Sequence, residues 1–242
     1  MVTLTNNEKK RYHRQLILPE FGEEAQQKLK QSSVLVIGAG GLGAPILKYL
    51  CSTGIGRLGF MDDDTVDISN LQRQIIYKEK DEDQLKAVTC KRHLQELNST
   101  IQIEAYPHRL TKENAGKLFA QYDIVIDACD NFKTRYLISE VAQQLHIPWI
   151  YGTVFEYGGQ VAVFNGQSQV QYTDLYPEAP EQDPTSDGVS VAVLPAVPGI
   201  IGSIQAAEAI KVLTGIGTPL DGKLLLFNAL DMSINKLQIN KT

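Results

Sequence analysis

Two basic side chains, Arg73 and Lys86, have the chemistry to hold a polyphosphate. Arg73 follows Asn70 in a polar segment, and Lys86 lies on an amphipathic stretch shortly after it. An arginine can grip phosphate oxygens with two hydrogen bonds at once, whereas a lysine acts on them as a point charge. Either residue alone is most often a solvated surface group. Together, beside an asparagine on a nucleotide-binding scaffold, they favour a triphosphate over the less charged pyrophosphate of a dinucleotide.

That scaffold is predicted by a glycine-rich motif that follows an apolar run and precedes a helical pattern. Its sequence is GAGGLG, and its glycines are Gly38, Gly40, Gly41 and Gly43. Glycines let the backbone turn tightly and approach phosphate oxygens, while the first turn of the following helix supplies N–H donors. The motif alone is a weak signal, but the strand before it and the helix after it favour nucleotide binding over a structural turn.

An acidic residue at the end of the second strand is expected to bind a ribose hydroxyl. Asp62 stands about 20 residues after the glycine motif, as that role requires. Asp63 and Asp64 follow it directly, and we interpret them as a solvated acidic turn.

Two further aspartates, Asp127 and Asp130, stand where another apolar strand ends. Ligands of open α/β sheets bind at the carboxyl ends of the strands, and carboxylates there are costly to desolvate without a cation. A Mg²⁺ ion that arrives with the phosphates is the natural partner for one of them. We predict Asp130 as the ligand, because it lies past the strand, and loop hydrogen bonding as the role of Asp127.

The elements that position these residues alternate between strand and helix patterns. Apolar runs predict strands at Ser33–Ile37, Arg57–Met61, Ile101–Tyr106, Tyr122–Asp127 and from Pro148 onward. Helical patterns lie at Ala44–Cys51, Gln84–Leu97, Thr111–Ala120 and Phe132–Leu145. This order predicts an α/β fold with a Rossmann-like, mostly parallel sheet and helices on both faces.

The later part of the chain changes character. Gly158–Phe164 and Ser168–Thr173 predict antiparallel strands joined by a turn at Asn165–Gly166, and Tyr176–Asp187 predicts a mobile loop. Pro198–Leu213 predicts a helix, and Lys223–Phe227 with Ser233–Ile239 predicts a final hairpin. We expect one domain over 1–242, with an N-terminal helical segment at 1–31, a nucleotide-binding half at 32–152 and an antiparallel, partner-binding half at 153–242.

The composition limits the partners and the compartment. A net charge of -5 and a pI of about 5.4 argue against general nucleic-acid binding. The three cysteines form no CxxC pair, and their odd number argues against a disulfide framework. The N-terminus lacks the apolar region of a secretory signal, and we expect no apolar run long enough to cross a bilayer. We expect a cytoplasmic protein that binds neither nucleic acid nor membrane.

Taken together, the motifs resemble those of the ubiquitin-activating-enzyme-like adenylyltransferases. The most similar bacterial members activate the small subunit of molybdopterin synthase or the thiazole sulfur carrier. The matching segments span nearly the whole chain: Arg11–Gln15 (RYHRQ), the glycine motif, Asp62, Ser69–Gln74 (SNLQRQ), Lys86, Asp130–Asn131 and Gly199–Lys211 (GIIGSIQAAEAIK).

The resemblance implies a role for each matching residue. It implies ATP contacts by the glycine motif, Asp62, Ser69, Asn70, Leu71, Gln72, Arg73, Lys86, Asp130 and Asn131. It implies catalytic roles for Arg14, Arg73, Lys86 and Asp130, with Asp130 as the Mg²⁺ ligand and Arg14 reaching the phosphates across a homodimer interface. It also implies a β-grasp sulfur-carrier partner that ends in Gly-Gly. The partner's carboxylate, already ionised at neutral pH, would attack the α-phosphorus and release pyrophosphate without a protein base.

The chain departs from this family at two places. Many relatives bind zinc through two CxxC pairs; the first would fall at Gln171 and Asp174, and the second lies beyond the final hairpin. We therefore expect no structural zinc. Many relatives also carry a loop cysteine near Gly188, which is absent here, so activation without covalent transfer is the remaining interpretation.

Other functions stay open at this point. An NAD-dependent oxidoreductase fits the fold but not the two cations. An adenylyltransferase or dehydratase that acts on a small molecule, a peptide or a modified tRNA nucleoside is a second alternative. A scaffold that retains a nucleotide site is a third, against which the intact cations argue. Between the two sulfur carriers, Val154–Phe164 slightly favours the molybdopterin branch.

Overall fold

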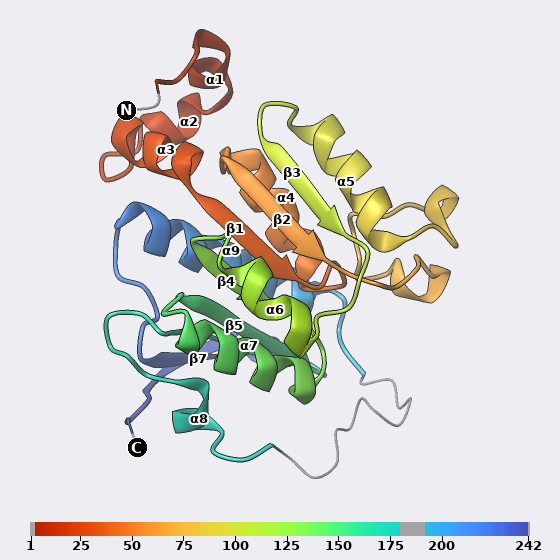
Figure 1. Ribbon diagram of the computed structural model, residues 1–242, viewed down its shortest axis with the longest axis vertical. Coiled ribbons are helices and arrows are strands. Elements are labelled where there is room, and N and C mark those ends of the chain that lie inside the picture. The colour runs from red at the N-terminus through yellow and green to blue at the C-terminus, as the bar shows by residue number, and fades with distance from the viewer. Residues whose placement is uncertain (1–2, 180–191, 242) are drawn as a thin grey trace.

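Eight strands form a single sheet in the order β3-β2-β1-β4-β5-β6-β7-β8 (Figure 1). The computed structural model describes residues 3–179 and 192–241. The strands are β1 (Ser33–Ile37), β2 (Arg57–Met61), β3 (Gln102–Tyr106), β4 (Ile124–Asp127), β5 (Trp149–Phe155), β6 (Gly158–Phe164), β7 (Lys223–Asn228) and β8 (Ser233–Gln238). Strands β1 to β5 pair in parallel, and β6, β7 and β8 continue the sheet antiparallel.

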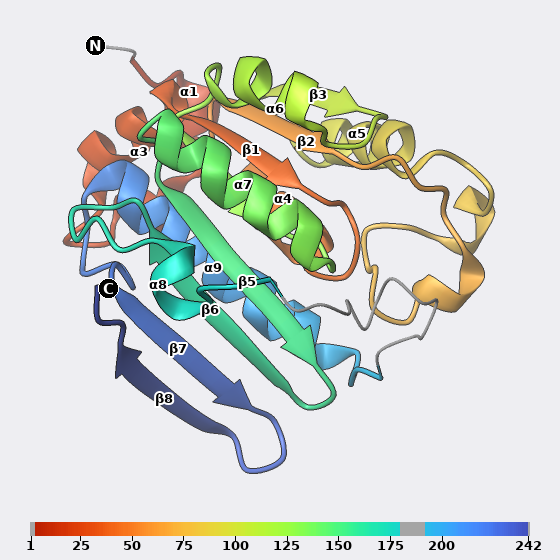
Figure 2. The same cartoon turned by 60° about the horizontal axis from the view of Figure 1, so that its bottom comes forward.

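Helices cover the parallel part of the sheet on both faces, as predicted (Figure 2). They are α1 (Asn6–Arg11), α2 (His13–Leu16), α3 (Gly22–Gln31), α4 (Gly43–Thr53), α5 (Lys86–Leu97), α6 (Lys112–Phe119), α7 (Phe132–Gln144), α8 (Tyr172–Leu175) and α9 (Ala196–Thr214), with 3-10 turns at η1 (Ile68–Asn70) and η2 (Glu79–Asp81). In β1, Val34 and Val36 join the core on one face, and Leu35 and Ile37 join the core on the other. A strand buried on both faces reads as a continuous apolar run, which is why SVLVI is so clear a signal.

One predicted strand is wrong. Ser168–Thr173 does not pair with β6, because β6 already has β5 on one side and β7 on the other. The antiparallel partner of β6 that is adjacent in the chain is therefore β5, across a turn at Glu156, whose φ is 45°.

The helix α8 occupies the end of that segment instead. The carboxylate of Asp174 accepts the backbone N–H of Gln171 at 2.7 Å and caps the helix. Tyr172 is fully buried, with its ring centroid 5.7 Å from Trp149 and 5.8 Å from Phe164. Burial of this aromatic side chain stabilises the helical turn against an extended alternative.

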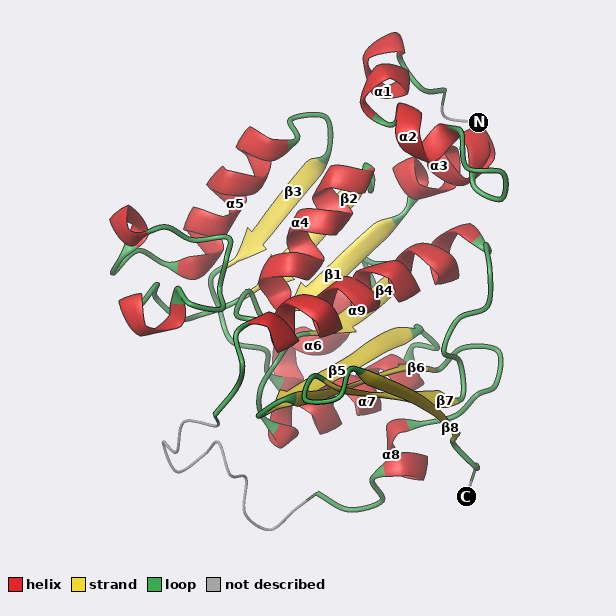
Figure 3. Ribbon diagram, turned by 180° about the vertical axis from the view of Figure 1, so that it is seen from behind, coloured by secondary structure: helices red, strands yellow, loops and turns green. Residues whose placement is uncertain are grey.

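The helix α9, the longest in the described residues, differs from one expectation drawn from the sequence. Its 19 residues are long and apolar enough to cross a membrane by length and composition, with a mean hydropathy of 1.3, so the expectation that no such run exists is wrong. The helix packs against β4, β5, β6 and α4, and Val197, Ile201 and Ala206 join the core. This packing explains its apolar composition, and Figure 3 shows α9 alongside the strands of the sheet.

The N-terminal helices lie at the end of the sheet where the parallel strands begin (Figure 1). Tyr12 anchors them: it is 3% exposed, and its hydroxyl accepts from Asn98 Nδ2 at 3.0 Å. A side chain at Gly54 would collide with the Tyr12 ring, and Gly54 also has a φ of 83°. Close packing therefore holds Arg14, on α2, at this end of the molecule.

Candidate nucleotide-binding site

A cavity of about 840 Å³ opens where the strands β1, β2 and β4 end. The chain runs from β1 outward to β2 and β3, then returns to β4 on the other side of β1, so the cavity lies at the topological switch point. Predicted site residues that line it are Gly38, Gly40, Gly41, Asp62, Ser69, Asn70, Gln72, Arg73, Lys86, Asp130 and Asn131. The fold thus brings most of the candidates to one place.

The glycine motif is required by close approaches at its two ends. Gly38 has a φ of 107°, and a Cβ there would come within 2.6 Å of the carbonyl oxygen of Ala128. A Cβ at Gly43 would collide with the carbonyl of Gly38, so Gly43 lets α4 approach the strand. A Cβ at Gly40 would make only an ordinary contact, at 3.6 Å, with the Gln74 side chain. Gly40 and Gly41 line the cavity beside the first turn of α4, where phosphate oxygens can approach the backbone.

Asp62 is held in place at the end of β2. One carboxylate oxygen accepts the backbone N–H of Ala39 at 2.8 Å, and the other accepts that of Asp64 at 3.0 Å. Burial raises the pKa of Asp62, an effect that Lys86 and the two hydrogen bonds oppose. The carboxylate therefore already spans from the strand to the glycine loop, where a ribose can meet it.

The two predicted cations line the same cavity and are each oriented by an acceptor. Arg73 Nη2 donates to Asn70 Oδ1 at 2.8 Å. Lys86, the first residue of α5, is 5% exposed, and its Nζ donates to Asp64 Oδ2 at 2.9 Å. The backbone carbonyl of Asp64 also accepts the N–H of Lys86 at 2.9 Å.

Asp64 is solvated, as the sequence predicts, with its side chain 64% exposed. It has a second role that the sequence does not reveal, because its carboxylate and its backbone carbonyl both accept hydrogen bonds from the nearly buried Lys86 at the cavity wall. In the sequence, Asp64 is only the third of three consecutive aspartates after a strand, and its pairing with Lys86 is evident only in the folded chain. Asp63 is also partly solvated: its side chain is 42% exposed and lies 3.3 Å from that of Arg109, which is 76% exposed.

The loop after β4 is built around a buried ion pair that the sequence did not reveal. Asp127 is fully buried, and its carboxylate lies 3.3 Å from Nε of Arg135 on α7. Asp127 Oδ1 also accepts the N–H of Cys129 at 2.9 Å, which is the loop hydrogen bonding that we predicted for it. Arg135 Nη2 donates to the carbonyl of Cys129 at 3.0 Å and to Thr153 Oγ1 at 2.9 Å. Burial raises the pKa of Asp127, while the guanidinium lowers it.

This loop presents Asp130 to the cavity as an exposed carboxylate. Asn131 caps the start of α7, since its side chain accepts the N–H of Thr134 at 2.9 Å. Within 3–179 and 192–241, no three His, Cys, Asp or Glu side chains converge to form a ready-made metal site. Mg²⁺ is often bound by one or two carboxylates together with substrate phosphates, and Asp130 fits that arrangement.

Three predicted residues do not line the cavity. Gly43 acts through helix packing, and the Leu71 side chain packs against the hydrophobic core. Arg14 is exposed on α2 at the opposite end of the sheet from the cavity. Lining residues that sequence reasoning missed include His108, Arg109, Thr134, Arg135 and Thr153, which lie in no motif of the sequence.

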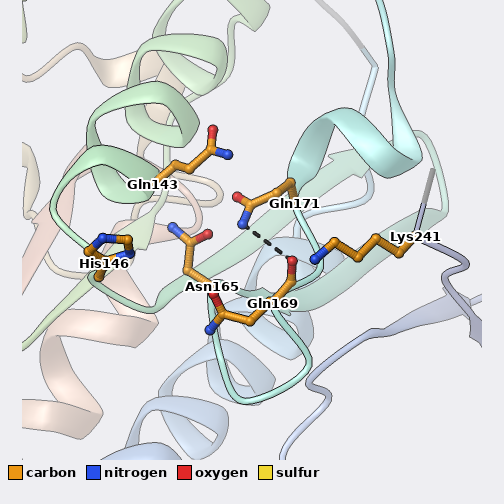
Figure 4. Close-up of a pocket in the computed structure, with 6 residues that line it drawn as sticks. All are labelled: Gln143, His146, Asn165, Gln169, Gln171 and Lys241. Carbon is orange, nitrogen blue, oxygen red and sulfur yellow. Dashed lines mark hydrogen bonds between the residues drawn. The ribbon is translucent and has the colours of Figure 1, made fainter.

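A second cavity, of about 210 Å³, lies near the C-terminal end of α7 (Figure 4). It is lined by Gln143, His146, Asn165, Gln169, Gln171 and Lys241. Gln171 stands where many relatives carry the first cysteine of a zinc-binding pair, and its Nε2 donates to the carbonyl of Gln169 at 3.4 Å. The six residues that line this second cavity include no carboxylate and no glycine loop, so the larger cavity is the better candidate for a nucleotide site.

Comparison with known proteins agrees with the geometry of the larger cavity. The model of the ThiF family matches residues 12–242. The chain belongs to the ThiF family. A sulfur carrier protein adenylyltransferase from Thermus thermophilus is 45% identical, covering 98% of this chain and 89% of that protein. A probable molybdopterin-synthase adenylyltransferase from Porphyra purpurea is 44% identical, covering 99% of this chain and 63% of that protein.

Solved structures agree at the level of the fold. A crystal structure of E. coli MccB with MccA-N7isoASN has a TM-score of 0.86 and 20% sequence identity, covering 98% of this chain and 74% of that chain.

The chain spans less than two thirds of the Porphyra relative, and nearly all of the Thermus one. As a ThiF-family member, this chain is an adenylyltransferase that uses ATP. The family assignment sets aside an NAD-dependent oxidoreductase.

Proposed function

We propose that this enzyme adenylylates the C-terminal glycine carboxylate of a small ubiquitin-like sulfur carrier and releases pyrophosphate. The observation that carries the proposal is the cavity that gathers Asp62, Arg73, Lys86 and Asp130 around a glycine loop. The names of the Thermus and Porphyra relatives, a sulfur carrier protein adenylyltransferase and a probable molybdopterin-synthase adenylyltransferase, support the substrate class.

The reaction needs charge neutralisation more than proton transfer. The carrier carboxylate is ionised at neutral pH, so one of its oxygens can attack the α-phosphorus directly. The new bond joins that oxygen to phosphorus, and the bond to the β-phosphate oxygen breaks as pyrophosphate leaves. In this proposal, Arg73 and Lys86, which both line the cavity, neutralise negative charge that develops on the phosphates.

Mg²⁺ would supply further charge neutralisation, and we propose Asp130 as its ligand. We expect Asp130→Asn to lower ATP–pyrophosphate exchange by about 100-fold, since loss of one well-placed electrostatic group costs about that much, and to raise the Mg²⁺ concentration that gives half-maximal exchange. Exchange measured over a magnesium titration checks this. Asp63→Asn is the matched control, because its carboxylate lines the same cavity but pairs with Arg109. Unchanged magnesium dependence in Asp130→Asn would move the ligand elsewhere.

An exposed group of apolar side chains next to the cavity suits a protein partner. This apolar turn patch comprises Phe155, Tyr157, Leu194, Leu230 and Met232, which are between 41% and 71% exposed. The patch lies on and beside the β5–β6 and β7–β8 hairpin turns, which are neighbours at one end of the sheet (Figure 2). The Ala229 N–H donates to the Tyr157 carbonyl at 2.8 Å and so connects the two turns. Such patches mark interaction sites.

Along the chain, the patch begins next to residues that line the cavity. Phe155 and Leu194 follow Val154 and Val193, which line the cavity, and the two segments are joined through Glu156 by backbone hydrogen bonds of 2.7 and 2.8 Å. A carrier bound on the patch could therefore extend its C-terminal glycines toward the nucleotide.

ATP–pyrophosphate exchange with each of two candidate carriers tests the function directly. The carriers are the small subunit of molybdopterin synthase and the thiazole sulfur carrier. Exchange that requires one of them and its C-terminal Gly-Gly would support acyl-adenylate formation and identify the pathway. No exchange with either would favour the alternative, an adenylyltransferase that acts on a small molecule, a peptide or a modified tRNA nucleoside.

A further inference from the structure

Tyr77 is a buried residue next to the cavity that the proposed reaction does not use. It follows Arg73 by four residues, and its side chain is 6% exposed. The ring belongs to the hydrophobic core that also includes Ala39, Ala87 and Cys90. Packing of the ring therefore fixes where the hydroxyl points.

The hydroxyl of Tyr77 links two separate parts of the nucleotide site. It donates to the backbone carbonyl of Ala39, in the glycine loop, at 2.9 Å. It also lies 3.5 Å from the carbonyl of Lys86, the first residue of α5. Burial raises the pKa of this hydroxyl well above its usual range, so the group stays a hydrogen-bond donor at any working pH.

Side chains hold both polar backbone groups of Ala39. Its carbonyl accepts from Tyr77, and its N–H donates to Asp62 Oδ2 at 2.8 Å. Ala39 is fully buried, and its neighbours Gly38 and Gly40 both line the cavity. Loss of the Tyr77 bond would free the Ala39–Gly40 peptide to rotate. The adjoining Gly38–Ala39 peptide, whose N–H binds Asp62, would then lose one of its restraints.

We propose that Tyr77 is a positioning residue for nucleotide binding. Its hydroxyl holds the glycine loop in a fixed position relative to Asp62 and to the start of α5. It touches no phosphate itself. The proposal rests on the proposed function for the identity of the site as the nucleotide site, but it does not depend on which substrate receives the adenylate. Preorganised backbone donors bind phosphate without a cost of reorganisation.

Tyr77→Phe tests the proposal, because it removes one oxygen atom and keeps the ring. We expect the dissociation constant for ATP with Mg²⁺, measured by calorimetry without any carrier, to rise about ten-fold, as for loss of one buried hydrogen bond. KM for ATP in the exchange assay should rise by the same factor, and KM for the carrier should not change. Because calorimetry uses no carrier, failure of the proposed carrier function would leave this test intact.

Tyr122→Phe is the matched control. Tyr122 is 5% exposed, and its hydroxyl donates to Glu104 at 2.9 Å, near the start of β4 and away from the cavity. Both variants should lose some thermal stability, but only Tyr77→Phe should lose ATP affinity. Unchanged ATP affinity in Tyr77→Phe, or a Tyr77→Phe protein that does not fold, would overturn the assignment and leave the hydroxyl a purely structural role.

A double-mutant cycle with Asp62→Asn tests the route through Ala39. If Tyr77 acts by holding Asp62 in place, the two substitutions should weaken ATP binding by less than the product of their separate effects, because the same contact is lost in both. Independent, multiplicative losses would overturn this route.

Discussion

Replacing Lys86 by alanine is expected to slow carrier-dependent ATP–pyrophosphate exchange by about 1,000-fold, with the fold retained. The ammonium group lines the cavity with its side chain only 6% exposed, so little water screens it from a phosphate. Asp64 accepts one of its three N–H donors in the structure, which leaves the others for a ligand. Arg73→Ala should have an effect of similar size, because Asn70 already orients its guanidinium toward the same site.

Stability separates this catalytic loss from unfolding. The Asp64 side chain is 64% exposed, so removal of Lys86 leaves a solvated carboxylate rather than an unpaired buried charge, and the protein should still unfold cooperatively at a measurable melting temperature. Lys91→Ala is the control, because Lys91 lies on the same helix but does not line the cavity. Normal exchange in Lys86→Ala or in Arg73→Ala would show that the triphosphate does not bind where we place it.

The parallel half of the fold was predictable from the sequence for a physical reason. Strands β1 and β2 have the predicted bounds, because buried parallel strands are continuous apolar runs that end at glycine or acidic turns. The helix α4 was predicted as Ala44–Cys51 and runs from Gly43 to Thr53. Here local sequence and global fold agree, so each motif falls at the end of a strand.

The antiparallel half was harder, because its pairing depends on neighbours distant in the chain. The alternating pattern of Gly158–Phe164 predicts a strand but not its partners. The strand β7, which follows some 60 residues later in the chain, pairs with the second edge of β6. This pairing excludes Ser168–Thr173 from the sheet. The final hairpin was correctly predicted, since β7 and β8 are adjacent both in sequence and in space.

Within the site, residue types revealed candidate ligands but not the groups that hold them. Arg73 and Lys86 were found because cations near a glycine motif are suited to phosphate. Asp64, Tyr77 and Arg135 were missed, because each acts on a backbone or side-chain atom that lies near it only in the folded chain. Such supporting groups have ordinary structural explanations until their partners are known.

Arg14 lies far from the cavity of its own chain, since α2 is at the opposite end of the sheet from the cavity (Figure 1). We propose that it serves the site of a second chain in a homodimer. Hybrid dimers of Arg14→Ala and Arg73→Ala chains, purified through two different tags, should then regain about half of the wild-type exchange activity, because one of two symmetric sites has neither defect. Hybrids of Arg73→Ala with Lys86→Ala should stay inactive, since each site keeps one defect.

A reciprocal hybrid makes the test of Arg14 decisive. When one chain carries both Arg14→Ala and Arg73→Ala and its partner is wild type, action across the interface leaves both sites defective and exchange should be lost. Action within one chain would instead leave one site intact and preserve about half of the activity. The two hybrids contain the same substitutions and differ only in how these are distributed, so stability and expression cannot account for opposite results. Activity in the reciprocal hybrid alone would place Arg14 outside the partner's site and remove the main reason for proposing the dimer.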